Sequence, residues 1–566
     1  MTFPNFKDRS FCNKTIMTIV LLHFISLMMA ARFYDQLWLN QVTLYGTLIL
    51  YLGLMPILWL WHRATRTQRV QDGLSDIRKA MEDIEELPPY DPREFFNLKK
   101  GLFVGLDIDR QFQPIYAPWR RVRKTHTQVV GTTGSGKGVA TTMMLWQCAL
   151  AGECVVIFDP KFPGDEFAPS VLYGLAQQRK IPFYLINLSP DVPTELEDRF
   201  PQNPPQFNLF AGCTPSQVEE LLTTAFSLED RGTDADHFRG QDRVACIDIC
   251  QRATAYGHIP TLHDLVQAAA KSTKIDAKRG EDLKNKLEEM SRLAVTNTAQ
   301  GYDLRTILAQ NAILYIIGHI RHSQVKRLQK MLLLRLMQII ERRDRRKPLR
   351  KVAMMLDELA YLLSPGALQA LAAVRDKGCH IFLAHQTLGD LRLGEGLDAV
   401  AVTAAVKGNT SLKLIYKVTD PDDTGKWASN LSGTIVVQQQ SSHMQQGMFH
   451  AAEGQFRQIE RPLLTINELT SLPDLTGMFF GNGLCRRIQV GIMPVGPYPT
   501  LVAAPPLVVP KPSTDENPVE EKPANDTTAG QTQAEATTKN NSGQPQSAVG
   551  DTTISQTAAD MKDVVG

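Results

Sequence analysis

The sequence predicts an α/β protein whose core is a parallel β-sheet with helices on both faces. Apolar runs of strand length alternate with helical stretches, an order typical of sheets whose parallel strands are joined by crossover helices. These runs are residues 154–158, 182–187, 312–318, 352–356 and 379–384. A further apolar run at 126–130 leads into a glycine-rich loop, and a helical stretch follows to about Leu150.

Length and composition fit a globular protein with about two or three folded units. Of its 566 residues, 43% are hydrophobic and 21% are charged, which is enough to build a sizeable core. The net charge of +2 gives no overall attraction for nucleic acid, so any basic surface must be local. Eight scattered cysteines without a C-x-x-C pair indicate a reducing compartment and argue against a disulfide framework or a zinc site.

Two segments near the start carry no charge and are long enough to cross a bilayer. They are residues 15–31 and 37–61, and they predict a transmembrane hairpin within an anchor of residues 1–66. Lysines and arginines flank both outer ends, so the positive-inside rule predicts two cytoplasmic termini. The alternative is a signal peptide cleaved near Ala30, but a second span follows at once.

Residues 67–100 are predicted to form an amphipathic helical linker, because apolar residues recur there at steps of four and three. This stripe is Val70, Leu74, Ile77, Met81 and Ile84. It fits a short coiled coil or a helix packed on its own domain. At the other end of the chain, residues 501–566 are rich in Pro, Thr, Gln and Ser and poor in large apolar residues, which predicts a disordered tail.

The glycine-rich loop has the G-x-x-x-x-G-K core of a Walker A motif between a strand and a helix, which predicts a P-loop for ATP. Its residues are Gly131, Thr132, Thr133, Gly134, Ser135, Gly136, Lys137 and Gly138. Glycines let backbone N–H groups surround phosphate oxygens, and Lys137 neutralises phosphate charge. Gly138 replaces the usual Ser or Thr that ligates Mg²⁺, so water or a nearby hydroxyl must fill that position.

The apolar run at 352–356 ends in two adjacent carboxylates, Asp357 and Glu358, as in a Walker B strand. We expect Asp357 to hold Mg²⁺ through water and Glu358 to polarise the attacking water. Lys137 and Asp357 are 220 residues apart (357 minus 137), more than the sheet requires. Helical periodicity explains the excess as an all-helical insertion at 208–305, leaving 101–207 and 306–500 for the nucleotide domain.

Together these motifs resemble the type IV coupling proteins of conjugation systems, the TraG/TraD group, over roughly residues 15–495. Several members of that group also carry glycine after the Walker A lysine. Other matching segments are Ile-Phe-Asp-Pro-Lys at 157–161, Arg-Asp-Lys-Gly at 375–378, Ala-His-Gln-Thr-Leu-Gly-Asp-Leu at 384–391, Asn-Thr-x-x-Lys at 409–413 and Thr-Asp-Pro-Asp at 419–422.

The resemblance implies a RecA-like nucleotide domain, an all-helical domain at the cytoplasmic mouth and a stem in the bacterial inner membrane, assembled as a hexameric ring. It implies ATP and Mg²⁺ as ligands. The implied partners are a relaxase, proteins of the secretion channel, and DNA gripped by its backbone without sequence specificity. Two alternatives stay open: an FtsK-like DNA translocase, and a substrate receptor that binds nucleotide without pumping DNA.

Two further roles follow from the resemblance and the ring. Arg375 is the candidate arginine finger for a neighbouring subunit's site, or else a surface arginine at a helix end. Gln386 is the candidate sensor that contacts the terminal phosphate or positions water, or else a capping or packing glutamine. Asp159 and Lys161 match an Asp-x-Lys of the group, and their role is open between a structural turn and a function.

Two basic runs are candidates for contact with DNA phosphates, although such runs are more often solvated helix ends. They are Arg342, Arg343, Arg345, Arg346, Lys347, Arg350 and Lys351 in the first run, and Arg120, Arg121, Arg123 and Lys124 in the second. No motif for reading a DNA sequence accompanies either run.

Overall fold

The computed structural model describes residues 45–46, 87–190, 192–196, 206–276, 279–298, 301–394, 397–441, 455–481 and 484–499. The predicted anchor at 1–66 lies outside them except for two residues, as do the apolar stripe of the linker and the predicted tail. Among the described helices, none combines the length and the apolar character needed to span a bilayer. The described end of the linker holds one short 3-10 helix, η1 (Pro92–Phe95).

The centre of the described chain is an eleven-stranded mixed sheet. In spatial order its strands are β2 (Gln113–Ala117), β1 (Leu102–Asp107), β13 (Leu484–Gln489), β12 (Thr476–Gly481), β9 (Thr410–Ile415), β3 (His126–Val130), β8 (Cys379–His385), β7 (Val352–Leu356), β4 (Cys154–Asp159), β6 (Ile313–Ile317) and β5 (Phe183–Asn187). The part from β9 to β5 is parallel throughout, which confirms the predicted parallel sheet.

The antiparallel part of the sheet was not predicted from the sequence. β9 pairs with β12, and β12, β13, β1 and β2 continue antiparallel to the edge. These strands have no crossover helix between them, so the strand–helix alternation does not extend to them. A separate antiparallel hairpin is formed by β10 (Thr434–Ser441) and β11 (Gln455–Pro462).

The described α-helices comprise those that cover both faces of the sheet and a group that lies beyond it. They are α3 (Trp119–Val122), α4 (Lys137–Leu150), α5 (Phe167–Arg179), α6 (Pro215–Phe226), α7 (Asp236–Ala253), α8 (Leu262–Ala270), α9 (Glu281–Ser291), α10 (Leu304–Ala309), α11 (Ser323–Glu341), α12 (Pro365–Asp376), α13 (Ala399–Asn409), α14 (Lys426–Leu431) and α15 (Ile466–Thr470). Strand β4 shows how the faces divide. Its Val155 and Ile157 join the core under α4 and α5, whereas Val156 and Phe158 point to the opposite core.

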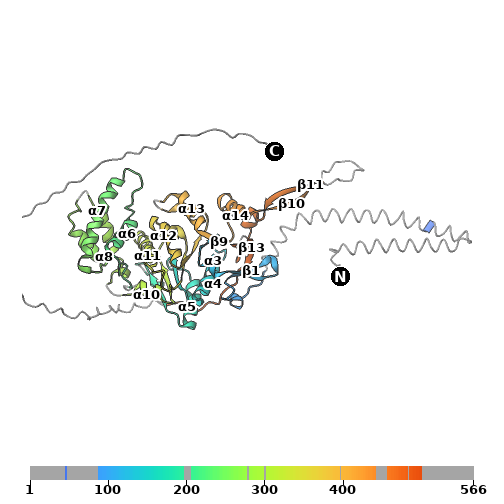
Figure 1. Cartoon of the computed structure of the whole chain (residues 1–566), viewed down its shortest axis with the longest axis horizontal. Helices are drawn as coiled ribbons and strands as arrows, with labels where there is room; N and C mark the ends of the chain where they lie inside the picture. Colours follow the sequence, from blue (N-terminus) through green and yellow to red (C-terminus); the bar gives the residue numbers. More distant parts are fainter. Residues whose placement is uncertain are drawn as a thin grey trace, which may run out of the picture. The chain divides into compact units, whose positions relative to one another are not determined.

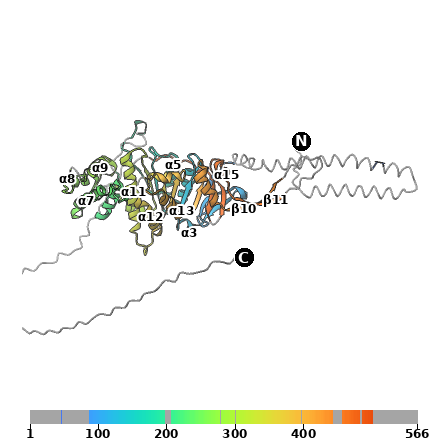
Figure 2. The same cartoon turned by 90° about the horizontal axis from the view of Figure 1, so that it is seen from above.

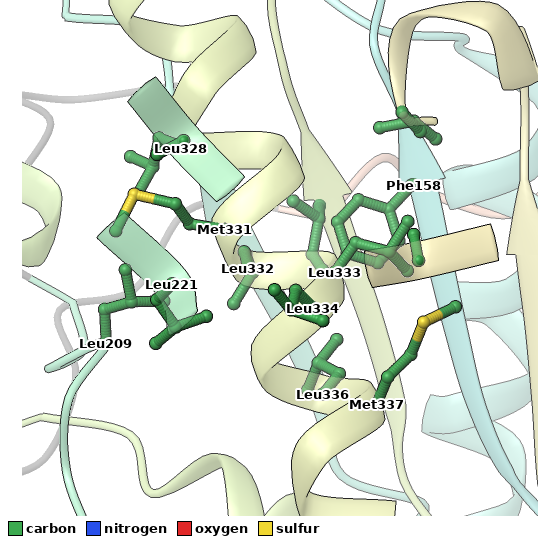
Figure 3. Close-up of a cluster of buried hydrophobic side chains, with 14 of the residues drawn as sticks. Phe158, Leu209, Leu221, Leu328, Met331, Leu332, Leu333, Leu334, Leu336 and Met337 are labelled. Carbon is green, nitrogen blue, oxygen red and sulfur yellow. The ribbon is translucent and has the colours of Figure 1, made fainter. Parts of the chain in front are cut away.

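Between β5 and β6 the described chain is mainly helical. Helices α6 to α10 occupy this stretch. Helices α7, α8 and α9 form a group on the side of the folded region opposite β10 and β11 (Figures 1 and 2). Their core is continuous with one face of the sheet. In Figure 3, α11 lies between Phe158 of β4 and the pair Leu209 and Leu221, and its apolar side chains face both.

Two buried histidines fix neighbouring strands at the edge where β3, β4 and β8 begin. His126 Nε2 donates to the Leu371 carbonyl at 2.8 Å, and its Nδ1 accepts from the Ile381 N–H at 3.1 Å. Burial lowers the pKa of His126 to about 4, so the ring is neutral and ties β3 to α12 and β8. At the same edge, His380 Nε2 lies 2.7 Å from the carboxylate of Glu153.

Glu153 is the centre of a buried charge cluster. Its carboxylate is 1% exposed and also accepts from Arg123 Nε at 2.6 Å. Glu153 thus connects the segments that precede β3 and β4 with His380 at the start of β8. Burial alone would raise the pKa of Glu153, but the bonds from His380 and Arg123 lower it below its usual value. The carboxylate therefore stays ionised and paired.

We expect Glu153→Gln to lower the free energy of unfolding by about 3 kcal/mol, because it leaves the half-buried Arg123 without its counter-charge and weakens the buried contact with His380. Chemical denaturation of the purified full-length chain measures this loss. Glu94→Gln removes the same charge from an exposed position and is the matched control. Equal stabilities of the two variants would contradict a structural role for the cluster.

Candidate functional site

The P-loop connects β3 to α4 and is shaped by its glycines. Gly131 and Gly136 have φ angles of 154° and 103°, in the region that favours glycine. A Cβ at Gly131 would lie 2.7 Å from Tyr416 Cβ, and one at Gly136 would lie 3.0 Å from Leu475 Cα. Lys137 donates to the carbonyl oxygens of Gly131 and Thr132, the latter at 3.0 Å. The lysine thus lies over its own loop at the N-terminus of α4.

The ends of four neighbouring parallel strands meet at the P-loop. β3, β8, β7 and β4 are consecutive in the sheet and run in one direction, so their carboxyl ends share one edge. The loop follows β3, Gln386 follows β8, Asp357 and Glu358 follow β7, and Lys161 follows β4 by two residues. This is the edge at which open α/β sheets bind their ligands.

Most of the loop, the two carboxylates and the lysine line one cavity of about 410 Å³, and Gln386 lies behind Glu358. Lys137, Asp357, Glu358 and Lys161 all contribute to its wall, so the two predicted nucleotide motifs do lie together. The hydroxyl-bearing residues of the wall are Thr132, Thr133, Thr141, Thr142 and Tyr315. Thr141 and Thr142 follow Gly138 on α4, and the Thr141 hydroxyl donates to the Lys137 carbonyl at 3.0 Å.

Glu358 is held at the centre of the cavity by two donors. Its Oε1 lies 2.5 Å from Lys161 Nζ and accepts from Gln386 Nε2 at 3.0 Å. The Glu358 backbone is left-handed, with φ 44° and ψ 56°, which a non-glycine residue adopts only at a cost of about 1 kcal/mol or more. Such local strain is common where a side chain must be aimed at a ligand.

Asp357 lies beside Glu358, but it is more exposed and farther from Lys161. The side chain is 32% exposed, and Lys161 Nζ is 3.9 Å from its Oδ2. Burial raises the pKa of Asp357 to about 6, Lys161 acts against this shift, and the charges of Asp159 and Glu358 add to it. A cation bound here would remove that repulsion, so the carboxylate suits a metal ligand.

Asp159 organises the loop that carries Lys161. Its carboxylate accepts from the N–H of Lys161 at 3.0 Å, from the N–H of Asp165 at 2.7 Å and from the Tyr315 hydroxyl at 2.9 Å. Asp159 is 3% exposed and borders the cavity, but its carboxylate is occupied by these three donors. Of the two residues whose role the sequence left open, Asp159 builds the turn and Lys161 faces the cavity.

Gln386 is likewise fixed by a carboxylate behind it. Asp390 Oδ2 accepts from the N–H groups of Gln386 and Thr387 at 2.9 and 2.8 Å. This holds the turn after β8, so that the Gln386 amide reaches Glu358. The sequence analysis assigned a role to Gln386 but not to Asp390, although Asp390 follows its two partners, Gln386 and Thr387, by only four and three residues.

Arg375 does not reach this cavity in its own chain. It lies in the last turn of α12, and its carbonyl accepts from the N–H of Gly378, just before β8 begins. That is the opposite edge of the sheet from the P-loop, one strand length or about 20 Å away. Its nearest ionic partner among the described residues is Asp376, at 3.7 Å.

Most of the first basic run is engaged with the protein. Arg343 donates to the Arg350 and Leu308 carbonyls at 3.0 and 2.9 Å, and Arg350 donates to the Ala309 and Gly152 carbonyls at 3.1 and 2.5 Å. Arg345 pairs with Asp376 at 3.0 Å. In the second run Arg123 belongs to the Glu153 cluster. These contacts favour the structural interpretation of both runs.

A segment that the sequence did not single out also touches the P-loop. Leu475, just before β12, lines the cavity, and its N–H donates to the Ser135 carbonyl at 3.2 Å. Its own carbonyl accepts from the Val490 N–H at 2.9 Å, and the neighbouring Gln489 side chain donates to the Pro88 carbonyl at 3.0 Å. Hydrogen bonds therefore connect Pro88, in the described end of the linker, with the P-loop through β13 and Leu475.

Known proteins resemble this chain in fold and in sequence. The protein family described as type IV secretory system conjugative DNA transfer matches residues 266–484. Mobilization protein A of Escherichia coli is 30% identical over 381 residues, which is 67% of each chain. Among solved structures, the bacterial conjugative coupling protein TrwBdeltaN70 superposes with a TM-score of 0.51 at 18% identity, over 73% of this chain and 93% of that one.

A second structure, the plasmid coupling protein TrwB in complex with a non-hydrolysable ATP analogue, has a TM-score of 0.50 at 18% identity and covers 73% of this chain and 94% of that one. The structural matches show a shared P-loop NTPase fold. The identity to the mobilization protein carries the likeness beyond the fold. The chain belongs to the type IV coupling proteins, the family of type IV secretory system conjugative DNA transfer.

Proposed function

We propose that the chain is a membrane-anchored ATPase that couples conjugative DNA, with its attached relaxase, to a type IV secretion channel and drives transfer by ATP hydrolysis. The observation that carries the proposal is the single cavity lined by the P-loop, Asp357 and Glu358. Family membership supports DNA transfer as the process. The ATP analogue bound by TrwB supports ATP as the ligand.

The residues of the cavity fit a Mg²⁺–ATP complex. Backbone N–H groups of the loop and the Lys137 ammonium would hold the phosphates, and Asp357 would hold Mg²⁺ through water. The metal ion would offset charge that develops on the phosphate oxygens. Glu358 would accept a proton from water while the water oxygen attacks the terminal phosphorus and the bond to the bridging oxygen breaks. Gln386 would keep Glu358 oriented for this step.

Hydroxyl groups of α4 are available for the coordination position that Gly138 leaves open. Thr141 and Thr142 both line the cavity. Their hydroxyl oxygens keep lone pairs after donating a hydrogen bond, so either can accept a water of the Mg²⁺ shell. The missing Ser or Thr after Lys137 is therefore compatible with metal binding.

The proposed site is completed by a second copy of the chain. Arg375 lies about a strand length from its own P-loop, so it can stabilise a transition state only in a neighbouring subunit. This supports a ring of subunits, with six as the number implied by the resemblance. The proposed regions are an inner-membrane anchor (1–66), a linker (67–100), the nucleotide domain (101–207 and 306–500), a helical domain (208–305) and a tail (501–566).

ATP turnover by the purified full-length chain, with and without DNA, tests the motor. We expect DNA to stimulate wild-type turnover. Lys137→Ala should weaken nucleotide binding by about tenfold or more, because a charge-assisted contact to phosphate is lost. Glu358→Gln should still bind ATP but hydrolyse it about 10²–10³ times more slowly, because the general base is gone. Glu94→Gln, at an exposed position, should match the wild type.

Unchanged turnover in Lys137→Ala would end the ATPase proposal. Nucleotide binding together with turnover that ignores DNA would instead favour a substrate receptor that uses nucleotide for assembly.

Mixing two inactive variants tests whether Arg375 acts between subunits. We expect Arg375→Ala and Glu358→Gln to be inactive alone and to recover part of the wild-type turnover after co-assembly. In the mixture, Arg375→Ala subunits retain an intact cavity and Glu358→Gln subunits retain the arginine. Arg345→Ala, which removes a neighbouring arginine paired with Asp376, is the matched control and should stay active. Absence of recovery in the mixture would contradict action on a neighbour.

A further inference from the structure

We propose that Lys161 is a triphosphate-dependent restraint on Glu358: its ammonium holds the carboxylate until a terminal phosphate takes the ammonium away. This inference rests on the proposed function, since it assumes that a nucleoside triphosphate binds at the P-loop. It assigns a positioning role to a residue that the Walker motifs do not include.

The contacts of Lys161 show one lysine with two carboxylate partners. Its Nζ is 2.5 Å from Glu358 Oε1 and 3.9 Å from Asp357 Oδ2. Burial alone would lower the pKa of Lys161, but the bond that its ammonium donates to Glu358 and the charge of Asp357 raise it overall, so the ammonium is charged. The ion pair links the ends of β4 and β7.

The two members of the pair differ in freedom. The Glu358 side chain is 10% exposed and also accepts from Gln386 at the same oxygen, Oε1, whereas the Lys161 side chain is 45% exposed. The backbone of Lys161 is anchored by Asp159, so only the four torsions of its side chain remain to move the ammonium. Lys161 can therefore leave Glu358 without any movement of the strands.

A terminal phosphate is a stronger attractor than Glu358 in the same cavity. It carries about two negative charges near neutral pH and three acceptor oxygens, against one charge on the carboxylate. Lys137 and Lys161 both line the cavity beside the P-loop, so both ammonium groups are available to phosphates bound there. A diphosphate lacks the terminal group and leaves Lys161 with Glu358.

The consequence for the reaction is that Glu358 becomes available as the base only after a triphosphate has bound. While Lys161 and Gln386 both donate to Oε1 of Glu358, the two lone pairs of that oxygen are engaged and cannot accept from water. Once Lys161 has turned to phosphate, Gln386 alone holds Glu358, and the carboxylate becomes available to water. The same lysine would then neutralise charge on the reacting phosphate. Product release returns Lys161 to Glu358.

The alternative is an ordinary ion pair at the rim of a cavity. Partly exposed pairs contribute roughly 0–1 kcal/mol to stability and have no preference between ligands. Affinity for the two nucleotide states separates this alternative from the proposal, because only a lysine shared between Glu358 and phosphate ties nucleotide preference to the state of Glu358.

The experiment measures dissociation constants of ADP and of a non-hydrolysable ATP analogue, with Mg²⁺, for the full-length chain. In Lys161→Met we expect triphosphate affinity to fall about tenfold while ADP affinity stays within about twofold, and Lys161→Arg to restore most of it. Lys180→Met is the matched control, because Lys180 is an exposed lysine at the end of α5 outside the cavity.

Glu358→Gln provides a second measurement that leaves Lys161 intact. Releasing the lysine from its carboxylate should tighten triphosphate binding several-fold, and the double variant with Lys161→Met should lose that gain. If the wild type binds neither nucleotide, the proposed function fails. The restraint is overturned, while the ATPase proposal stands, if the wild type binds both nucleotides and either of two results is found. One is that Lys161→Met binds them like the wild type, and the other is that the double variant binds them like Glu358→Gln.

Discussion

The candidate site depends on one constraint, the common direction of β3, β8, β7 and β4. Because these strands are parallel and adjacent, the chain that leaves each of them emerges at the same edge. A phosphate-binding loop, two carboxylates and a lysine from distant parts of the sequence are thus brought to one cavity, and a glutamine is brought into contact with one of the carboxylates. Reversing any of these strands would move its residue to the far edge, where Arg375 lies.

The opposite edge is held together by different chemistry. There the strands begin, and buried His126, His380 and Glu153 join them by hydrogen bonds and paired charge. Basic residues next to this edge cap backbone carbonyls that the sheet and its helices leave unpaired, as Arg343 and Arg350 do. Part of the positive charge that the sequence offered for DNA, on Arg123, Arg343 and Arg350, is therefore bound to the protein itself.

The sequence was sufficient for the parts of the fold that local patterns encode. The loop at 131–138, the carboxylates after 352–356 and the apolar runs of the parallel sheet follow from residue type and spacing alone. The order of the strands does not, because β8 lies between β3 and β7 although it follows both in the chain. Nor does the antiparallel extension, in which β1 pairs with a strand near residue 489.

Lys161 illustrates the same limit at the site. The sequence supplied an Asp-x-Lys after a strand, but the direction of the lysine depends on Asp159 and on Tyr315, 156 residues away. Likewise, Gln386 was recognisable from the family pattern, whereas its contact with Glu358 required β7 and β8 to be neighbours. Residue types can be predicted from a pattern, and the partners they meet are decided by long-range packing.

The hydrogen bonds from Pro88 through Gln489 and Leu475 to Ser135 give the antiparallel extension a meaning beyond enlarging the sheet. They fasten the phosphate loop to the stretch of polypeptide that arrives from the N-terminal side. The loop is consequently coupled mechanically to that side. A force applied to the incoming chain would act through these hydrogen bonds on the backbone that shapes the P-loop.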